Sequence, residues 1–324
     1  MGIRGLAAGA AVVVVAAGCG ASHEQQAAGA RSTSAQQAVK VGLPATANAT
    51  SGYIAGKRFF HRAGLAFAPV EVTNGAKAIP MLLNGQLDIA LGDGMGSLTA
   101  AANGVPLQVI GVATQAPADP KLDPTALATA DRGVTAAGLA GKSVAVSQLG
   151  GAPELVAKSA IDAGGGDSSA VKFVELGSAQ MVAALKAHRV DAALLTEPNA
   201  TAAEQQGLPI LSRPQSLGEP GLPSTLWVTS KKYAAQHPDV IKKFLAAVQS
   251  GGREANADPA GARKVAATFM SIDPKVLQAI RFPQFAHDVA DTAPVRRFVD
   301  LANRYQAFPK QPDLARVLAG RSHS

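Results

Sequence analysis

Cysteine is almost absent from this chain: Cys19 is the only one among 324 residues. A single thiol excludes a disulfide within the chain. Aromatic residues make up only 4% of the sequence, so stacking on rings is not expected to dominate binding. The six histidines are scattered, and no pair has the spacing that places two metal ligands on one helix face. No nucleophile and base form a recognisable set, so the sequence predicts no metal, no other cofactor and no catalytic centre.

Charged residues are also sparse, at 16%, and lysine plus arginine exceed aspartate plus glutamate by 30 − 23 = 7. The excess is scattered, and no basic patch interleaved with aromatics, helix-turn-helix or zinc pattern accompanies it. Nucleic acid is therefore not an expected partner. With 324 residues and 47% hydrophobic content, the chain is long enough for about two domains with a substantial core.

The first 18 residues have the proportions of an export signal. Arg4 supplies a positive start, and the apolar stretch that follows is too short to span a bilayer. A run of small residues then precedes Cys19, which resembles a bacterial lipobox, although Ala16 stands where leucine is usual. The sequence predicts a signal peptide over 1–18, an acylated Cys19 and an extracytoplasmic protein tethered to the membrane. An ordinary signal peptide is the alternative, and residues 19–38 are expected to be a disordered tether.

One sequence pattern occurs twice. Residues 75–93 and 177–197 each predict a short helix, a tight turn and a strand that opens on an aspartate, Asp88 or Asp191. The apolar run after each aspartate is unbroken, which is typical of a parallel strand covered on both faces. We interpret the two aspartates as structural groups that cap the preceding turn. The duplication predicts two similar α/β lobes, each with a loop at the carboxyl end of its strand, where ligands bind in open α/β sheets.

Elsewhere, hydrophobic runs and breaker residues predict further strands and helices. The expected strands are 39–43, 67–72, 107–114, 126–129, 143–147, 171–176 and 224–229. The expected helices are 52–62, 97–102, 153–163, 238–249, 259–270, 274–280 and 293–305. Because proline is tolerated only in the first turn of a helix, Pro80 predicts that the first repeat's helix begins near Ala78 or is kinked.

Two segments rich in proline and glycine or aspartate, 115–124 and 212–223, predict two crossings between the lobes. Lobe I then consists of residues 39–114 and 224–324, and lobe II consists of residues 125–211.

Several weak motifs occur in a specific order across residues 39 to about 250. They are the opening strand with its polar loop, Phe59–Leu65, the Gly-x-Leu-Asp-Ile-Ala run at 85–90, the segment 139–146, the strand from Asp191 that ends in Glu197-Pro198, and 237–245. Together they resemble the substrate-binding proteins of bacterial ABC importers, in the group for nitrate, sulfonates, taurine and thiamine precursors. Pro80 and Gly138 depart from the family pattern, and the cysteine-rich motif of the thiamine-precursor branch is absent.

The resemblance implies an α/β, two-lobed periplasmic-binding-protein type II fold with a helical C-terminal segment. It also implies hinge closure over a small-molecule ligand. The implied protein is a monomer whose partners are an ABC permease and its ATPase.

The candidate ligand-binding residues lie in loops that follow strands, because free N–H groups at helix N-termini favour anionic groups there. Four loops qualify: 44–51, 92–97, 147–152 and 196–197. The predicted site residues are Thr46, Asn48, Thr50, Ser51, Asp93, Ser97, Ser147, Gln148, Gly150, Thr196 and Glu197. For any one of the serines and threonines, an ordinary helix cap is the alternative role.

Two of these residues are acidic. Asp93 and Glu197 follow the two repeat strands and are expected to face the cleft from opposite lobes, while the four loops contain no lysine or arginine. Two carboxylates would repel a pure anion such as nitrate unless an arginine or lysine neutralises them. For either residue, capping of the following helix is the alternative role. The resemblance, the loop hydroxyls and the helix N-termini imply an oxyanion, and the two carboxylates favour an amine on the same molecule. The expected ligand is a small organic oxyanion that also carries an amine, best represented by a taurine-like aminosulfonate or, more widely, an alkanesulfonate.

The sequence is compatible with three classes of function. The leading one is the solute-binding lipoprotein of an ABC importer. An enzyme of the pyrimidine- or thiamine-precursor type on the same fold and a sensor module are the alternatives, and the missing catalytic cluster argues against the enzyme. The glycine-rich run Gly92–Ser97 after a strand also invites a dinucleotide-binding interpretation, but the next strand lacks the acidic residue that such a site needs.

Overall fold

The computed structural model describes residues 36–73, 75–218 and 220–318. Both lobes belong to one compact unit that begins at Gln36. Cys19, the signal peptide and most of the expected tether lie outside the described residues. Within the described part, no helix is long and apolar enough to cross a bilayer.

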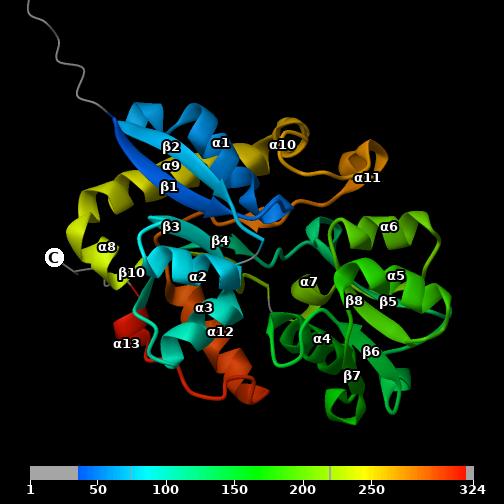
Figure 1. The fold of residues 1–324 in the computed structure, drawn as a ribbon. Coiled ribbons are helices and arrows are strands. Elements are labelled where there is room, and N and C mark those ends of the chain that lie inside the picture. Colours follow the sequence, from blue (N-terminus) through cyan, green and yellow to red (C-terminus); the bar gives the residue numbers. More distant parts are fainter. Residues whose placement is uncertain (1–35, 74, 219, 319–324) are drawn as a thin grey trace, which may run out of the picture. The chain divides into compact units, whose positions relative to one another are not determined.

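The first lobe contains a six-stranded sheet in the order β11-β4-β10-β3-β1-β2 (Figure 1). Its strands are β1 (Gln37–Leu43), β2 (Leu65–Glu71), β3 (Ile89–Asp93), β4 (Leu107–Gln115), β10 (Pro223–Ser230) and β11 (Gln284–Phe285). The central strand β3 lies between a parallel neighbour, β1, and an antiparallel neighbour, β10. The unbroken apolar run of β3 therefore belongs to a buried strand of a mixed sheet.

The second lobe contains a five-stranded sheet in the order β7-β6-β8-β5-β9. Its strands are β5 (Thr125–Thr129), β6 (Ser143–Val146), β7 (Lys172–Glu175), β8 (Ala192–Thr196) and β9 (Ile210–Ser212). Like β3, the central strand β8 has one parallel neighbour, β6, and one antiparallel neighbour, β5. The two sheets thus share a topology, as the repeated sequence predicts, and the α/β two-lobed fold class is confirmed.

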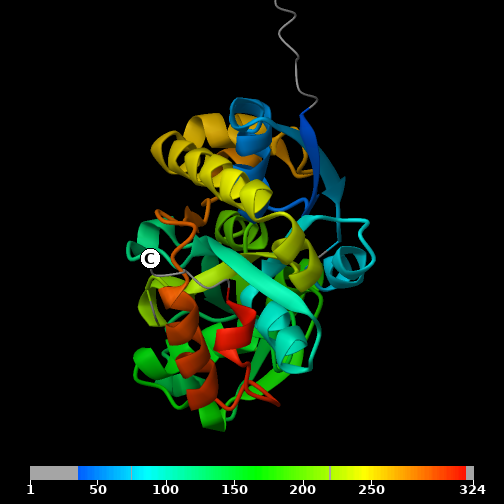
Figure 2. The same cartoon turned by 90° about the vertical axis from the view of Figure 1, so that its left-hand side faces the viewer.

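Helices cover both sheets. Four of them, α4 (Ala152–Ala163), α5 (Ser178–Lys186), α6 (Asn199–Gln205) and α7 (Pro214–Gly218), belong to the second lobe or to the chain that leaves it. The first lobe carries α1 (Thr50–Arg58), α2 (Gly75–Leu83), α3 (Gly94–Ala102), α8 (Lys231–Gln236), α9 (Pro238–Ala257), α10 (Pro259–Ala266), α11 (Pro274–Ala279), α12 (Ala293–Arg304) and α13 (Leu314–Val317). Figure 2 shows the long helix α9 in yellow, returning to pack beside α1 in blue. The C-terminal segment is helical, as expected, apart from the short strand β11.

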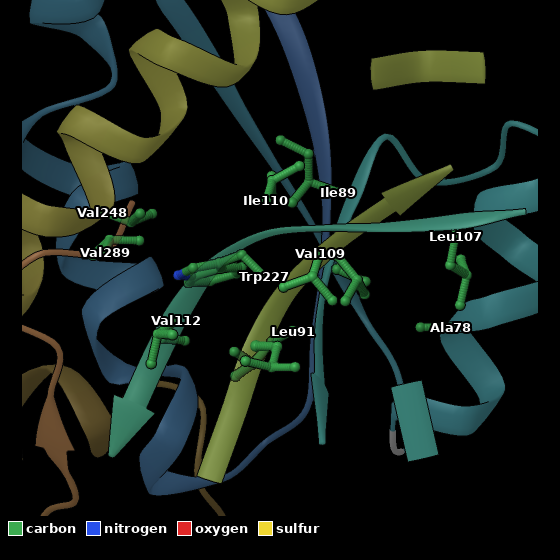
Figure 3. Packing of buried hydrophobic residues seen from close by; sticks show 14 of the residues in the cluster. Ala78, Ile89, Leu91, Leu107, Val109, Ile110, Val112, Trp227, Val248 and Val289 are labelled. Carbon is green, nitrogen blue, oxygen red and sulfur yellow. The ribbon is translucent and has the colours of Figure 1, made fainter. Parts of the chain in front are cut away.

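The core of the first lobe is built around Trp227 of β10. Its side chain is fully buried, and its ring meets the ring of Phe244 on α9 edge-on, with 5.0 Å between centroids. Figure 3 shows Leu91, Val109 and Val112 of the neighbouring strands around the same indole. Burying an aromatic side chain of this size against aliphatic neighbours is among the largest single contributions to a core.

Several element boundaries differ from the sequence predictions. Gln37 and Ala38, expected in the tether, belong to β1 because they pair with β2 along its full length. Helix α2 begins at Gly75 and holds Pro80 in its interior, since Ala78 and Leu82 are buried in the core and that packing outweighs the lost backbone bond. The expected crossing back, 212–223, begins at the last residue of β9 and contains the short helix α7.

The largest difference in length is that of α9, which continues to Ala257 instead of ending near residue 249. It passes through Gly251 and Gly252, which are buried against neighbouring elements. A Cβ on Gly251 would clash with the carbonyl oxygen of Ser51 and lie 2.9 Å from the amide nitrogen of Ala55. The glycines therefore let α9 lie against the backbone of α1, and helix packing overrides the low helix propensity of glycine.

This close approach gives a prediction for paired variants. Alanine at either glycine should gain up to about 1 kcal/mol of helix propensity. Gly251→Ala should nevertheless lower the free energy of unfolding by roughly 1–3 kcal/mol, because its methyl group meets rigid backbone. Gly252→Ala is the matched control, since its nearest neighbour is a side-chain carbon of Phe285 at 3.0 Å. If urea unfolding gives Gly251→Ala and Gly252→Ala equal free energies of unfolding, the packing argument is contradicted.

Candidate ligand-binding site

A cavity of about 300 Å³ is lined by residues from both lobes. Asp93, the last residue of β3, and Thr196, the last residue of β8, both line it. The cavity therefore lies at the carboxyl ends of the two central strands, where open α/β sheets bind ligands. The crossings contribute as well, through Ala116, Pro214 and Gln215.

Most of the lining is apolar. The larger apolar side chains are those of Leu155 and Val156 on α4, Leu194 on β8, Leu222 before β10, and Phe298 and Leu301 on α12. We call these six residues the apolar wall. A ligand that fills the cavity must place hydrocarbon against this wall, because a polar group there would lose its hydration without gaining a partner.

The polar lining contains hydrogen-bond acceptors and hydroxyl groups but a single charge. Among the described lining residues, Asp93 is the only charged side chain, and lysine, arginine and histidine are absent. Asp93 also caps α3, because its Oδ1 accepts a hydrogen bond of 2.6 Å from the amide of Gly96. The helix thus fixes the position of this carboxylate at the edge of the cavity.

Four of the eleven predicted site residues line the cavity: Asn48, Asp93, Gln148 and Thr196. The other seven do not, and they fall into three groups. Thr50, Ser51 and Ser97 are buried inside the first lobe. Thr46, Ser147 and Gly150 are exposed outside the lining, and Glu197 is engaged elsewhere.

Glu197 does not face the cavity, contrary to the expectation of two acidic groups in the cleft. Its carboxylate accepts hydrogen bonds from the amide and hydroxyl of Thr201, at 3.1 and 2.9 Å, and from the amide of Arg281 at 3.2 Å. The Arg281 guanidinium lies 3.6 Å from the same carboxylate, whose side chain is only 2% exposed. Glu197 therefore caps α6 and pairs with a cation that comes from 84 residues away in the sequence.

Arg281 joins separate parts of the chain. It follows α11, which contacts α6 of the second lobe (Figure 1). Its guanidinium donates 3.0 Å to Glu204 of α6 and 3.2 Å to the carbonyl of Lys121 in the first crossing. Glu204 also forms an ion pair with Arg213 of the second crossing. These residues form an interlobe ion network of Glu197, Glu204, Arg213 and Arg281.

Sequence reasoning missed Gln215. Its Oε1 is buried and has no hydrogen-bond partner among the described residues, although Gln215 lines the cavity. Its backbone is fixed by the amide, which donates 3.4 Å to the hydroxyl of Thr125. The only available signal was a polar residue inside the segment expected to be a crossing, and composition alone assigns such a residue to solvent.

A second contact between the lobes lies near the end of α12. The hydroxyl of Tyr305 donates a hydrogen bond of 2.8 Å to Oδ2 of Asp162 on α4. Burial and this hydrogen bond to a carboxylate raise the pKa of Tyr305 to about 12. The tyrosine therefore remains a protonated donor throughout the neutral range. In the described part of the chain, no cluster of histidine, cysteine, aspartate and glutamate has the geometry to hold a metal ion.

Comparison with known proteins gives a consistent answer about the family and fold. The family profile described as NMT1/THI5 like matches residues 46–262. No curated protein matches the chain by sequence.

Among solved structures, the alkanesulfonate-binding protein SsuA from Xanthomonas axonopodis pv. citri bound to MOPS has a TM-score of 0.67 and 22% identity, and the alignment covers 87% of this chain and 98% of that one. The periplasmic aliphatic sulphonate binding protein SsuA from Escherichia coli has a TM-score of 0.70 and 20% identity, over 89% and 96%. The periplasmic nitrate-binding protein NrtA from Synechocystis PCC 6803 has a TM-score of 0.64 and 15% identity, over 87% and 86%. These similarities show the fold that the sequence predicted.

The ion network predicts that Arg281 supports stability. Arg281→Met should lower the free energy of unfolding by about 1–3 kcal/mol, because Glu197 stays buried while it loses its cation and keeps only its bonds to backbone and Thr201. Lys275→Met removes the same charge from an exposed site on α11 and serves as the control. Equal unfolding midpoints for the two variants in urea would show that the network contributes nothing.

Proposed function

The chain belongs to the NMT1/THI5-like family, and on that premise we propose that it is the solute-binding lipoprotein of an ABC importer. The observation that carries this proposal is the cavity at the carboxyl ends of β3 and β8, which both lobes line. Such a site binds a small molecule when the lobes close and releases it when they open. The partners are an ABC permease and its ATPase, and the binding protein acts as a monomer.

The proposal includes a hinge. The segments 115–124 and 212–223 connect the two sheets and are the proposed hinge crossings between lobe I, 39–114 with 224–324, and lobe II, 125–211. The Tyr305–Asp162 hydrogen bond and the interlobe ion network are contacts that such a motion would break or remake.

For the ligand, we favour an organic sulfonate that carries an amine. Support for the sulfonate comes from the binding proteins of similar fold, which are named for alkanesulfonate, aliphatic sulphonate and nitrate. The start of α4 lines the cavity through Ala152 and Pro153, but its first turn already carries Glu154, whose carboxylate accepts a hydrogen bond of 2.7 Å from the amide of Gly150. Support for the amine comes from Asp93, which has no cationic neighbour in the described lining. Glu197 adds no support for the amine, because it does not line the cavity.

A melting-temperature screen tests the ligand class. Taurine at about 100 times its dissociation constant should stabilise the protein by roughly 2.7 kcal/mol, and it should do so at lower concentration than ethanesulfonate or nitrate. Asp93→Asn should weaken taurine about tenfold or more, because a charge-assisted hydrogen bond is lost, while asparagine still caps α3.

Glu197→Gln is the matched control and should leave the preference for taurine over ethanesulfonate unchanged, since Glu197 does not line the cavity. A thermal shift with nitrate or ethanesulfonate but not with taurine would refute the amine in the proposed ligand. The protein would then still be a binding protein for anions.

The anchor is a separate part of the proposal. Cys19 follows a run of small residues after a short apolar stretch, and we expect its thiol to be acylated after the signal is removed. Cys19→Ser should move the protein from the membrane fraction to the soluble extracytoplasmic fraction, because a serine hydroxyl is not acylated at this position. Fractionation in which Cys19→Ser stays with the membrane would refute the lipid anchor, whatever the ligand.

A further inference from the structure

The first lobe presents a second surface at the ends of its strands that lie opposite the cavity. The strands β1, β2, β3 and β4 all begin there, because β1 is parallel to β2 and β3, and β10 runs antiparallel to β3 and β4. Strand β10 ends there, and α8 and α9 follow it directly. Figure 2 faces this surface and shows the start of β1 in blue and the long helix α9 in yellow.

This surface gathers basic residues from separate parts of the sequence. Lys231 and Lys232 open α8, and Lys242 and Lys243 lie in the second turn of α9, which contacts α8. Arg62 lies in the short 3-10 turn before β2, and this turn also contacts α9. All five side chains are exposed. We call these five residues the basic surface.

Aromatic packing fixes the segments that carry the basic surface. The ring of Phe60, just before the turn that holds Arg62, meets the ring of Phe244 on α9 with 5.7 Å between centroids. Phe244 directly follows Lys243 and also packs on Trp227 of β10, the strand that leads into α8. Because these three rings are buried, the basic side chains stand on a rigid part of the lobe.

The charges of the basic surface are not neutralised within the described part of the chain. None of its five residues forms an ion pair there. Two carboxylates lie in the neighbouring segments: that of Asp88 before β3, which accepts 2.7 Å from the amide of Lys40, and that of Asp239 in the first turn of α9. They do not balance five cations.

The two lobes also differ in charge as a whole. In lobe I, lysine and arginine exceed aspartate and glutamate by 20 − 11 = 9, whereas lobe II has 6 − 8 = −2. The positive charge that is scattered along the sequence is therefore concentrated in one lobe by the fold. A surface of this kind favours an anionic partner.

The chain enters the fold beside the basic surface. The side chain of Gln36 donates a hydrogen bond of 3.3 Å to the carbonyl of His61, the residue before Arg62. Cys19 precedes Gln36 by 36 − 19 = 17 residues, which span at most about 60 Å whatever conformation they take. With the proposed lipid on Cys19, the membrane lies within that distance of the point where the chain meets the basic surface.

Resting on the proposed function, we propose that the basic surface docks on the anionic headgroups of the membrane that holds the lipid anchor. Each lysine or arginine near an anionic membrane is worth about fivefold in affinity, and a tether raises the effective concentration of the two surfaces. The anchor and the basic surface then act as two membrane signals on one protein. Because the cavity lies at the opposite ends of the strands, docking does not cover the ligand site.

Vesicle sedimentation tests the docking without the lipid. The protein used is the chain from Gly20 onward, which lacks the anchor and keeps the whole compact unit. At low salt, about 50 mM, it should bind phosphatidylcholine vesicles that contain about one-third phosphatidylglycerol at least roughly tenfold more tightly than vesicles of phosphatidylcholine alone. At about 1 M salt the difference should be lost, because the screening length falls to about 3 Å.

A fourfold variant locates the interaction. Changing Lys231, Lys232, Lys242 and Lys243 to glutamine should weaken binding to the anionic vesicles by roughly a hundredfold or more. The matched control removes the same charge from four exposed residues of lobe II that form no ion pair in the described part of the chain: Arg132→Gln, Lys172→Gln, Lys186→Gln and Arg189→Gln. This control should weaken binding less than about fivefold.

Equal losses in the two fourfold variants would show that net charge alone drives the binding, and they would overturn the basic surface as the docking site. Equally weak binding of the unaltered protein to both kinds of vesicle would overturn the membrane as the occupant, and an acidic protein would then be the partner to seek. Neither result touches the proposed function, because the vesicle assay involves no solute and no anchor. The lysine variant should still bind taurine as the unaltered protein does.

Discussion

A reciprocal pair of hydrogen bonds at one end of each sheet fixes the register on which the ligand site depends. In the first lobe, the amide of Asp88 donates 2.9 Å to the carbonyl of Lys40, and the amide of Lys40 donates 2.7 Å to the Asp88 carboxylate. Asp191 and Ser143 repeat this pair in the second lobe, at 3.0 and 2.8 Å. The hydrogen bonds that the amide and hydroxyl of Ser143 donate to the Asp191 carboxylate lower the pKa of Asp191, so this carboxylate remains ionised at neutral pH. A slip of one residue would turn every side chain of β3 or β8 to the opposite face and move the cavity-lining loop with it.

The same pair shows how far the sequence predicted the fold. The repeated aspartate and the unbroken run behind it predicted two similar buried strands, because those signals are local and depend on burial. The role of the aspartates was wrong in detail: they bond to the neighbouring strand, 48 residues away, instead of capping the turn. Length and apolarity locate a strand, whereas the partner of a polar group at its end depends on which strand lies next to it.

Some residues of the candidate site could likewise be predicted from the sequence, and others could not. Asp93 and Thr196 were found because they end the two central strands, and strand ends meet at one edge of a sheet. Thr50 and Ser51, also predicted, lie outside the cavity lining because the glycines of α9 pack on α1 and bury its first turn, which the sequence does not reveal. Glu197 was misjudged because Arg281, which neutralises it, comes from beyond α11. Gln215 was missed because a glutamine in a crossing carries no pattern of its own.

The fold determines where the cavity lies, whereas a few side chains determine the charge of its lining. Duplicated sheets and two crossings place a cavity between the lobes whatever its charge, which is why proteins with less than a quarter of their residues in common share this architecture. The sign of the ligand's charge is set at the cavity wall. Arg281 and Arg213 are close in the fold, but Glu197 and Glu204 engage both cations outside the lining. The interlobe ion network therefore does more than join the lobes. By engaging these arginines outside the lining, it leaves Asp93 as the charged side chain of the described lining, and under the proposed function this favours an ammonium over a bare anion.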